Sequence, residues 1–129
     1  MNWIAIIVAT VVYMVLGSLW FSALFGKRWT ALRVGPPMSG TASPLLYVIT
    51  AVGALVSAIT LDWIIGLAGA NSLIGGAIIG LYAGLGIAAP AILADHLFNE
   101  RPAMLYAIVA GYPIVGLLLM GGIIGAVGA

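Results

Sequence analysis

The sequence predicts an all-α fold, a bundle of four transmembrane helices, on three observations. Charged residues make up 5% of the 129 residues and hydrophobic residues 64%, whereas soluble domains contain about 25% charged residues. Four apolar stretches each have about 20 residues, the length of helix that crosses a hydrocarbon core of about 30 Å. These stretches are apolar on every face and lack the alternation of membrane β-strands. Composition therefore excludes soluble enzymes and nucleic-acid-binding domains.

Charged and turn-forming residues mark the limits of the four spans. The predicted spans cover residues 3–25, 45–67, 72–93 and 103–127 of a single integral membrane domain, residues 1–129. Lys27 and Arg28 follow the first span, Pro44 precedes the second, and Pro102 precedes the fourth. The first span has no basic residue before it and exceeds the 7–15 apolar residues of a secretory signal, so we expect it to be retained.

The basic residues lie on one side of the predicted membrane. Loops 26–44 and 94–102 contain all four of them: Lys27, Arg28, Arg33 and Arg101. The positive-inside rule places these loops in the cytoplasm and both termini outside. This distribution predicts a multi-pass protein of the inner (cytoplasmic) membrane. Residues 27–34 alternate basic and apolar side chains, which fits either a short interfacial helix or an ordinary basic loop.

Small residues at four-residue spacing indicate where membrane helices pack closely. The third span has three of these helix-packing candidates and the fourth has two: Gly76, Gly80, Gly84, Gly121 and Gly125. Such faces fit packing within the chain or contact with another chain. The expected partners are therefore the lipid bilayer and either a second copy of the chain or another membrane protein.

Two prolines inside the spans predict bends and a candidate cavity between the third and fourth helices. Pro90 and Pro113 lack the N–H that would bond the carbonyls of Gly86 and Val109. Those carbonyls either bind a ligand or accept a hydrogen bond from a nearby hydroxyl. The candidate cavity residues are Tyr82, Pro90, Tyr112 and Pro113, and Tyr13 is a further candidate donor.

One dense polar group lies at the end of the third span: Asp95, His96, Asn99, Glu100 and Arg101. If the helix continues through Glu100, His96 and Glu100 share a face at i,i+4, as do Asp95 and Asn99. The group then fits a proton relay or a headgroup site, and the alternative is a solvated helix end whose acids pair with Arg101. The chain has one His and no Cys, so the sequence predicts no metal site, no cofactor and no catalytic residue.

Residues along nearly the whole chain resemble those of a known family. The similarity covers nearly the whole chain and rests on Met1, Asn2, Trp3, Gly17, Trp20, Leu24, Phe25, Gly26, Trp29, Phe98, Glu100, Arg101, Pro102, Leu105, Gly111 and Tyr112. These residues resemble the small bacterial membrane proteins grouped as domain of unknown function 1761. The resemblance implies a four-helix membrane architecture and a bacterial context, so the expected location is the bacterial inner membrane. It supplies no established activity.

A short motif occurs twice. Four residues after the first span (Leu24, Phe25, Arg28 and Leu32) recur at constant offset after the third as Leu97, Phe98, Arg101 and Leu105. This recurrence predicts two helical hairpins in a parallel repeat.

The function that these features favour is packing or assembly, as a homo-oligomer or a small subunit of a membrane complex. The alternative is a small transporter or channel with a site between the third and fourth helices. A third is an enzyme that acts on lipid headgroups through His96 and Glu100. No charge lies at mid-depth in the first, third and fourth spans, which argues against charge-coupled transport.

Overall fold

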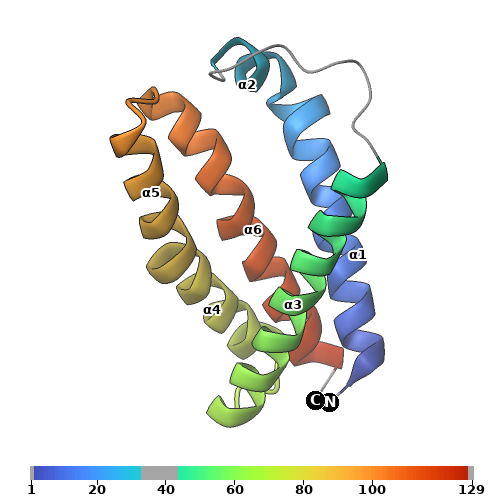
Figure 1. Ribbon diagram of the computed structural model, residues 1–129. Helices are drawn as coiled ribbons and strands as arrows, with labels where there is room; N and C mark the ends of the chain where they lie inside the picture. The colour runs from blue at the N-terminus through green and yellow to red at the C-terminus, as the bar shows by residue number, and fades with distance from the viewer. Residues whose placement is uncertain (1, 33–43, 128–129) are drawn as a thin grey trace.

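The structure is a computed structural model that describes residues 2–32 and 44–127. The regular structure of these residues is entirely helical, as predicted. The elements are α1 (Trp3–Leu19), the π-helical turn η1 (Trp20–Leu24), α2 (Gly26–Leu32), α3 (Pro44–Ala68), α4 (Leu73–Ala83), the π-helical turn η2 (Gly84–Ala88), α5 (Ala89–Phe98) and α6 (Ala103–Val127) (Figure 1).

Within the described residues, four helical segments are long and apolar enough to cross a membrane: Trp3–Leu24, Pro44–Ala68, Leu73–Phe98 and Ala103–Val127. The all-α prediction with four spans is therefore confirmed, and the chain has the features of a multi-pass membrane protein. The third span reaches Phe98 instead of residue 93, so Asp95 and His96 belong to the helix. Residues 27–32 are part of α2, and residues 33 and 34 lie outside the described residues.

The same backbone turn ends α3 and α5. After α3, Gly69 adopts a φ of 66° and Ala70 N–H donates to Ile65 O at 3.0 Å. After α5, Glu100 adopts a φ of 54° and Arg101 N–H donates to His96 O at 3.0 Å. Both are Schellman motifs, in which a left-handed residue lets the backbone satisfy its last free carbonyls. The left-handed turn at Glu100 therefore ends α5 sharply.

Helix α6 is the centre of the bundle and packs against α1, α3, α4 and α5. The start of α1 and the end of α6 lie at one end, with α2 and the α5–α6 turn at the other (Figure 1). The main buried cluster contains Ala5, Ile6, Ala9, Ala58, Leu61, Ile65, Met120 and Ile124. These residues come from the start of α1 and the later parts of α3 and α6, so the core lies toward the end where α1 starts and α6 ends. At the opposite end, residues 44–50 of α3 are exposed.

The glycines of α4 and α6 bring the two helix backbones into direct contact. A Cβ on Gly76 would meet the Gly121 carbonyl, and a Cβ on Gly80 would meet the Leu117 carbonyl. A Cβ on Gly84 would lie 2.7 Å from Ile114 Cα. Because lipid tails are as apolar as the side chains, such close approach is a main source of attraction between membrane helices.

The backbone near Pro90 adapts in a way that the sequence did not indicate. The π-helical turn η2 lies directly before Pro90, and Ala89 N–H donates to Gly84 O across it. Such a local change of helix type is one way in which membrane helices accommodate proline. Among the described residues, no tyrosine hydroxyl bonds the Gly86 or Val109 carbonyl. Of the expected donors, Tyr112 donates to the Tyr13 carbonyl instead.

The two copies of the repeated motif have different surroundings. Phe25 follows η1 and Phe98 ends α5, so both stand where a spanning helix stops. Arg28 lies inside α2, whereas Arg101 lies in the turn before α6. The local structures therefore agree only at the helix ends, and the parallel repeat stays a hypothesis.

Candidate functional site

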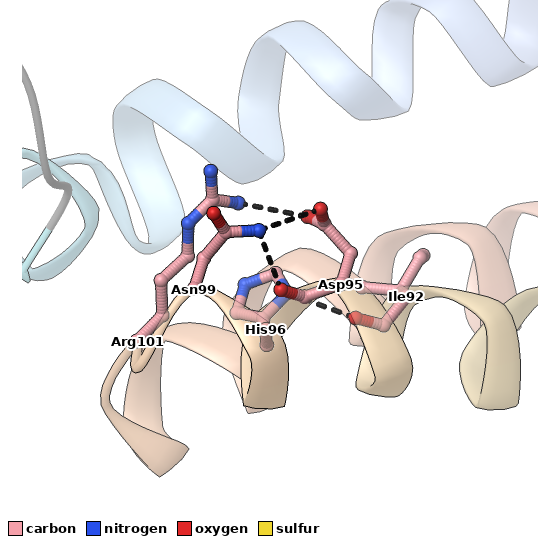
Figure 2. Close-up of polar contacts among 5 residues, drawn as sticks. All are labelled: Ile92, Asp95, His96, Asn99 and Arg101. Carbon is pink, nitrogen blue, oxygen red and sulfur yellow. Dashed lines mark hydrogen bonds and ion pairs between the residues drawn. The ribbon is translucent and has the colours of Figure 1, made fainter.

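The polar group at the end of α5 forms a self-contained cap. Arg101 Nη1 pairs with Asp95 Oδ2 at 3.0 Å, and Asn99 Nδ2 donates to Asp95 Oδ1 at 3.0 Å and to the Asp95 carbonyl at 2.8 Å. Figure 2 shows these three side chains meeting at the helix end. All three are exposed. The contacts fit the solvated helix end that was the alternative to a site.

His96 and Glu100 do not share a helical face, because α5 ends at Phe98. His96 is 3% exposed, and its Nδ1 donates to Ile92 O at 3.0 Å (Figure 2). Its ring lies edge-on to that of Tyr106, with centroids 5.7 Å apart. Its Nε2 is buried and has no hydrogen-bond partner in the described part of the chain. Glu100 is exposed in the left-handed turn. The pair therefore offers no open acid–base site for a headgroup.

The third and fourth spans were expected to enclose a cavity. At Gly76, Gly80 and Gly84 the backbones of α4 and α6 are in direct contact, so this stretch of the interface leaves no room for one. Tyr82 is 68% exposed on the outer side of α4, and Pro90 is exposed on α5. Pro113 lies within α6, where its carbonyl faces Gly84. Tyr112 of this set lines a hollow on the opposite side of α6.

This hollow is a groove of about 550 Å³ between α1, η1, α2, the first turns of α3, and α6. It is half open to the surroundings, and its wall is mainly apolar. We call it the lateral groove. Its lining consists of Met14, Gly17, Ser18, Phe21, Ser22, Trp29, Leu46, Tyr47, Thr50 and Tyr112. From Met14 to Ser22 the wall extends about 12 Å along the helix, at 1.5 Å per residue.

Aromatic rings form one wall of the lateral groove. Phe21 lies between two of them, with ring centroids 5.1 Å from Trp29 and 5.6 Å from Tyr112. Tyr112 is fixed in turn, because its hydroxyl donates to the Tyr13 carbonyl at 2.7 Å and the two tyrosine rings lie 4.6 Å apart. This wall therefore has a defined shape before any ligand binds.

Three hydroxyl groups of the groove, those of Ser22, Thr50 and Tyr112, already use their protons. Thr50 Oγ1 donates to the Leu46 carbonyl at 3.0 Å, and Ser22 Oγ donates to the Ser18 carbonyl. A hydroxyl oxygen has one proton and two acceptor lone pairs. These groups therefore present acceptors to the groove, which is otherwise apolar.

Three glycines hold the aromatic residues between α1 and α6. A Cβ on Gly17 would lie 2.7 Å from Tyr112 Oη, and one on Gly111 would lie 2.8 Å from Trp20 Cζ2. A Cβ on Gly116 would lie 2.6 Å from Tyr13 Cδ2. We call these contacts the glycine–aromatic interlock. Four-residue spacing did not indicate it, because each glycine faces a ring from a distant helix instead of a second small residue.

The π-helical turn η1 sends neighbouring side chains in different directions. Trp20 points to α6, where its Nε1 donates to the Ile108 carbonyl at 2.8 Å, whereas Phe21 and Ser22 line the groove. The wider turn appears in the bond from Phe25 N–H to Trp20 O at 3.0 Å. Such single π turns are frequent at functional sites.

The described residues contain no cluster of side chains that could hold a metal ion. No group of three or more His, Asp or Glu side chains is placed to hold a metal ion there. The lateral groove, with apolar walls and a few polar acceptors, is the feature best suited to a ligand.

Comparison with known families identifies the chain. The family model described as "Protein of unknown function (DUF1761)" matches residues 4–125, so the chain belongs to this family and the resemblance seen in the sequence is confirmed. Neither the curated proteins nor the solved structures gave a match.

Proposed function

We propose that this DUF1761 protein binds a membrane amphiphile, a molecule with an apolar chain and a polar group, in the lateral groove. The observation that carries the proposal is the volume and lining of the groove, about 550 Å³ with mainly apolar walls and hydroxyl acceptors. Small-molecule sites are typically hollows of about 300–1,000 Å³ with apolar walls and few polar groups. Because the groove is partly open, a ligand would enter from the side.

The groove supports binding without coupling to an ion gradient. Ser18, Thr50 and Tyr112 are neutral at ordinary pH, and none of the lining residues among 2–32 and 44–127 is formally charged. Proton relays in transporters are built from ionisable side chains at membrane depth. The sequence-based alternative was a small transporter or channel with a site between the third and fourth helices. The proposal keeps a ligand site within the membrane and places it in the lateral groove.

We expect a bulky side chain in the groove to displace the ligand. Thr50→Trp should lower retention of phosphatidylcholine by at least about tenfold, since filling a formed site costs more than about 1.4 kcal/mol. The measurement is native mass spectrometry of protein released from detergent after addition of the lipid.

Thr60→Trp is the matched control. Thr60 is also exposed on α3, and its Oγ1 donates to the Val56 carbonyl at 2.8 Å, as Thr50 does to Leu46. Thr60 does not line the groove. Equal lipid retention by the two variants would overturn the proposal.

Assembly is a second candidate, and one observation favours it. The glycines of α4 and α6 face each other within the chain, but Gly53 of α3 is exposed and a Cβ there would meet nothing within 4 Å. Gly53 and Ser57 form a small-residue pair at four-residue spacing that is free to contact another chain. The same mass spectra test this: a defined oligomer of the wild type that Gly53→Leu dissociates supports assembly, and a wild-type monomer contradicts it.

The location that we propose is the bacterial inner membrane, with the basic loops in the cytoplasm. The distribution of Lys27, Arg28, Arg33 and Arg101 supports this orientation. An alkaline phosphatase fused after Ala129 should be active, because that enzyme needs the oxidising side of the membrane. An inactive fusion that is produced at normal levels would reverse the orientation.

A further inference from the structure

We propose that the ligand of the lateral groove is an anionic phospholipid whose phosphate group binds at Lys27. This inference rests on the proposed function and adds the chemical class of the ligand. It joins two features, the groove itself and an unpaired cation beside it.

A second hollow continues the lateral groove toward α2. It is a shallow depression of about 570 Å³ lined by Phe21, Ser22, Gly26, Lys27, Thr30 and Ala31. Phe21 and Ser22 line both hollows. A single molecule can therefore extend from the apolar groove, past η1, to the side chains of Lys27 and Thr30.

Lys27 is free to bind an anion. It is exposed, and it has no ion-pair or hydrogen-bond partner among residues 2–32 and 44–127. The ion pair in that part of the chain joins Arg101 to Asp95. A Lys ammonium is a compact charge with three N–H donors, which suits a phosphate.

The position of Lys27 along the chain matches the level of a lipid headgroup. It follows the first membrane span, which ends at Leu24, so its ammonium stands where the apolar region stops. The groove beside the end of that span holds apolar and hydroxyl-bearing side chains. This order, apolar groove and then cation, is the order of chain and phosphate in a phospholipid.

Arg28 provides a matched control on the same helix. Its Nη1 lies 3.7 Å from Met104 Sδ, so the guanidinium is turned toward α6, and Arg28 lines neither hollow. Lys27→Gln and Arg28→Gln remove the same charge. If anionic lipid is attracted to the basic surface in general, its binding should weaken in both variants. If it binds at a site formed by Lys27, its binding should weaken only in Lys27→Gln.

The test is competition between two lipids with identical acyl chains, phosphatidylglycerol and phosphatidylcholine, read by native mass spectrometry of the full chain. We expect wild type to prefer phosphatidylglycerol by about fivefold, the worth of one cation near the surface. Lys27→Gln should abolish the preference and Arg28→Gln should keep it. Soluble glycerol 3-phosphate, which lacks acyl chains, should not displace the lipid.

The outcomes separate this inference from the proposed function. If Thr50→Trp lowers retention of both lipids but Lys27→Gln leaves the preference unchanged, the headgroup assignment is wrong and the groove site stands. Equal loss of preference in Lys27→Gln and Arg28→Gln also overturns the assignment, as does displacement by glycerol 3-phosphate. If Thr50→Trp changes nothing, the groove site itself is wrong.

Discussion

Replacing Gly80 with alanine should destabilise the protein by about 3 kcal/mol, at the upper end of the cost of overpacking. The added methyl would overlap the Leu117 carbonyl of α6, with Leu118 Cα 3.0 Å from the same Cβ. Both obstacles are backbone atoms, so no change of rotamer relieves the overlap and α4 must move away from α6. The measurement is the midpoint of reversible unfolding by denaturant in mild detergent.

Gly53→Ala is the control for this prediction. Gly53 also lies inside a spanning helix, but its Cβ would meet no atom within 4 Å. Alanine is favoured over glycine in helices by about 0.8–1.0 kcal/mol, so this variant should be neutral or more stable. Equal stability of Gly80→Ala and wild type would show that the α4 and α6 backbones are not in direct contact at Gly80.

The sequence was sufficient to predict the spans because the bilayer imposes a length and a composition on every helix. It placed the second span at 45–67, and α3 covers Pro44–Ala68. It placed the third too short, because Asp95 and His96 suggested a polar loop. The helix keeps both residues, since its end is set by the left-handed turn at Glu100 and not by polarity.

Glycine spacing identified the α4 and α6 faces but could not say what they contact. In the structure Gly76 and Gly121 face each other. The glycine faces that favoured assembly with another chain therefore contact each other within this chain. Predicting the glycine–aromatic interlock would need a different signal, the pairing of a glycine with a ring about a hundred residues away, as with Gly116 and Tyr13. Spacing along one helix does not contain that information.

The lateral groove could not be predicted from charge or motif. Ser18, Thr50 and Tyr112 are each unremarkable in a membrane helix, and only the fold brings them to one hollow. The π-helical turn η1 also changes which side chains of the first span point there. The pattern of ionisable residues instead favoured Asp95 and His96. In the structure Asp95 pairs with Arg101 at the end of α5, and His96 is buried between α5 and α6 against Tyr106.

Replacing Gly116 with alanine should lower both stability and lipid retention. The new methyl would collide with the Tyr13 ring, because its carbon would lie 2.6 Å from Tyr13 Cδ2. Tyr13 is held by stacking on Tyr112 and by the bond from the Tyr112 hydroxyl to its carbonyl. A displaced Tyr13 therefore moves Tyr112, which lines the groove. We expect a loss of about 1–3 kcal/mol, measured by denaturant unfolding.

Gly122→Ala is the matched control on the same buried helix. Its Cβ would lie 3.3 Å from Leu73 Cδ1, the movable end of a side chain, so the change in stability should stay within about 0.5 kcal/mol. Tyr13→Leu combined with Gly116→Ala supplies a second check. If the ring is the obstacle, the double variant should lose less unfolding free energy than the two single variants lose in sum, by about 0.5–3 kcal/mol. Strict additivity would mean that Gly116 acts through another contact, and the interlock would then not explain how α1 is held against α6.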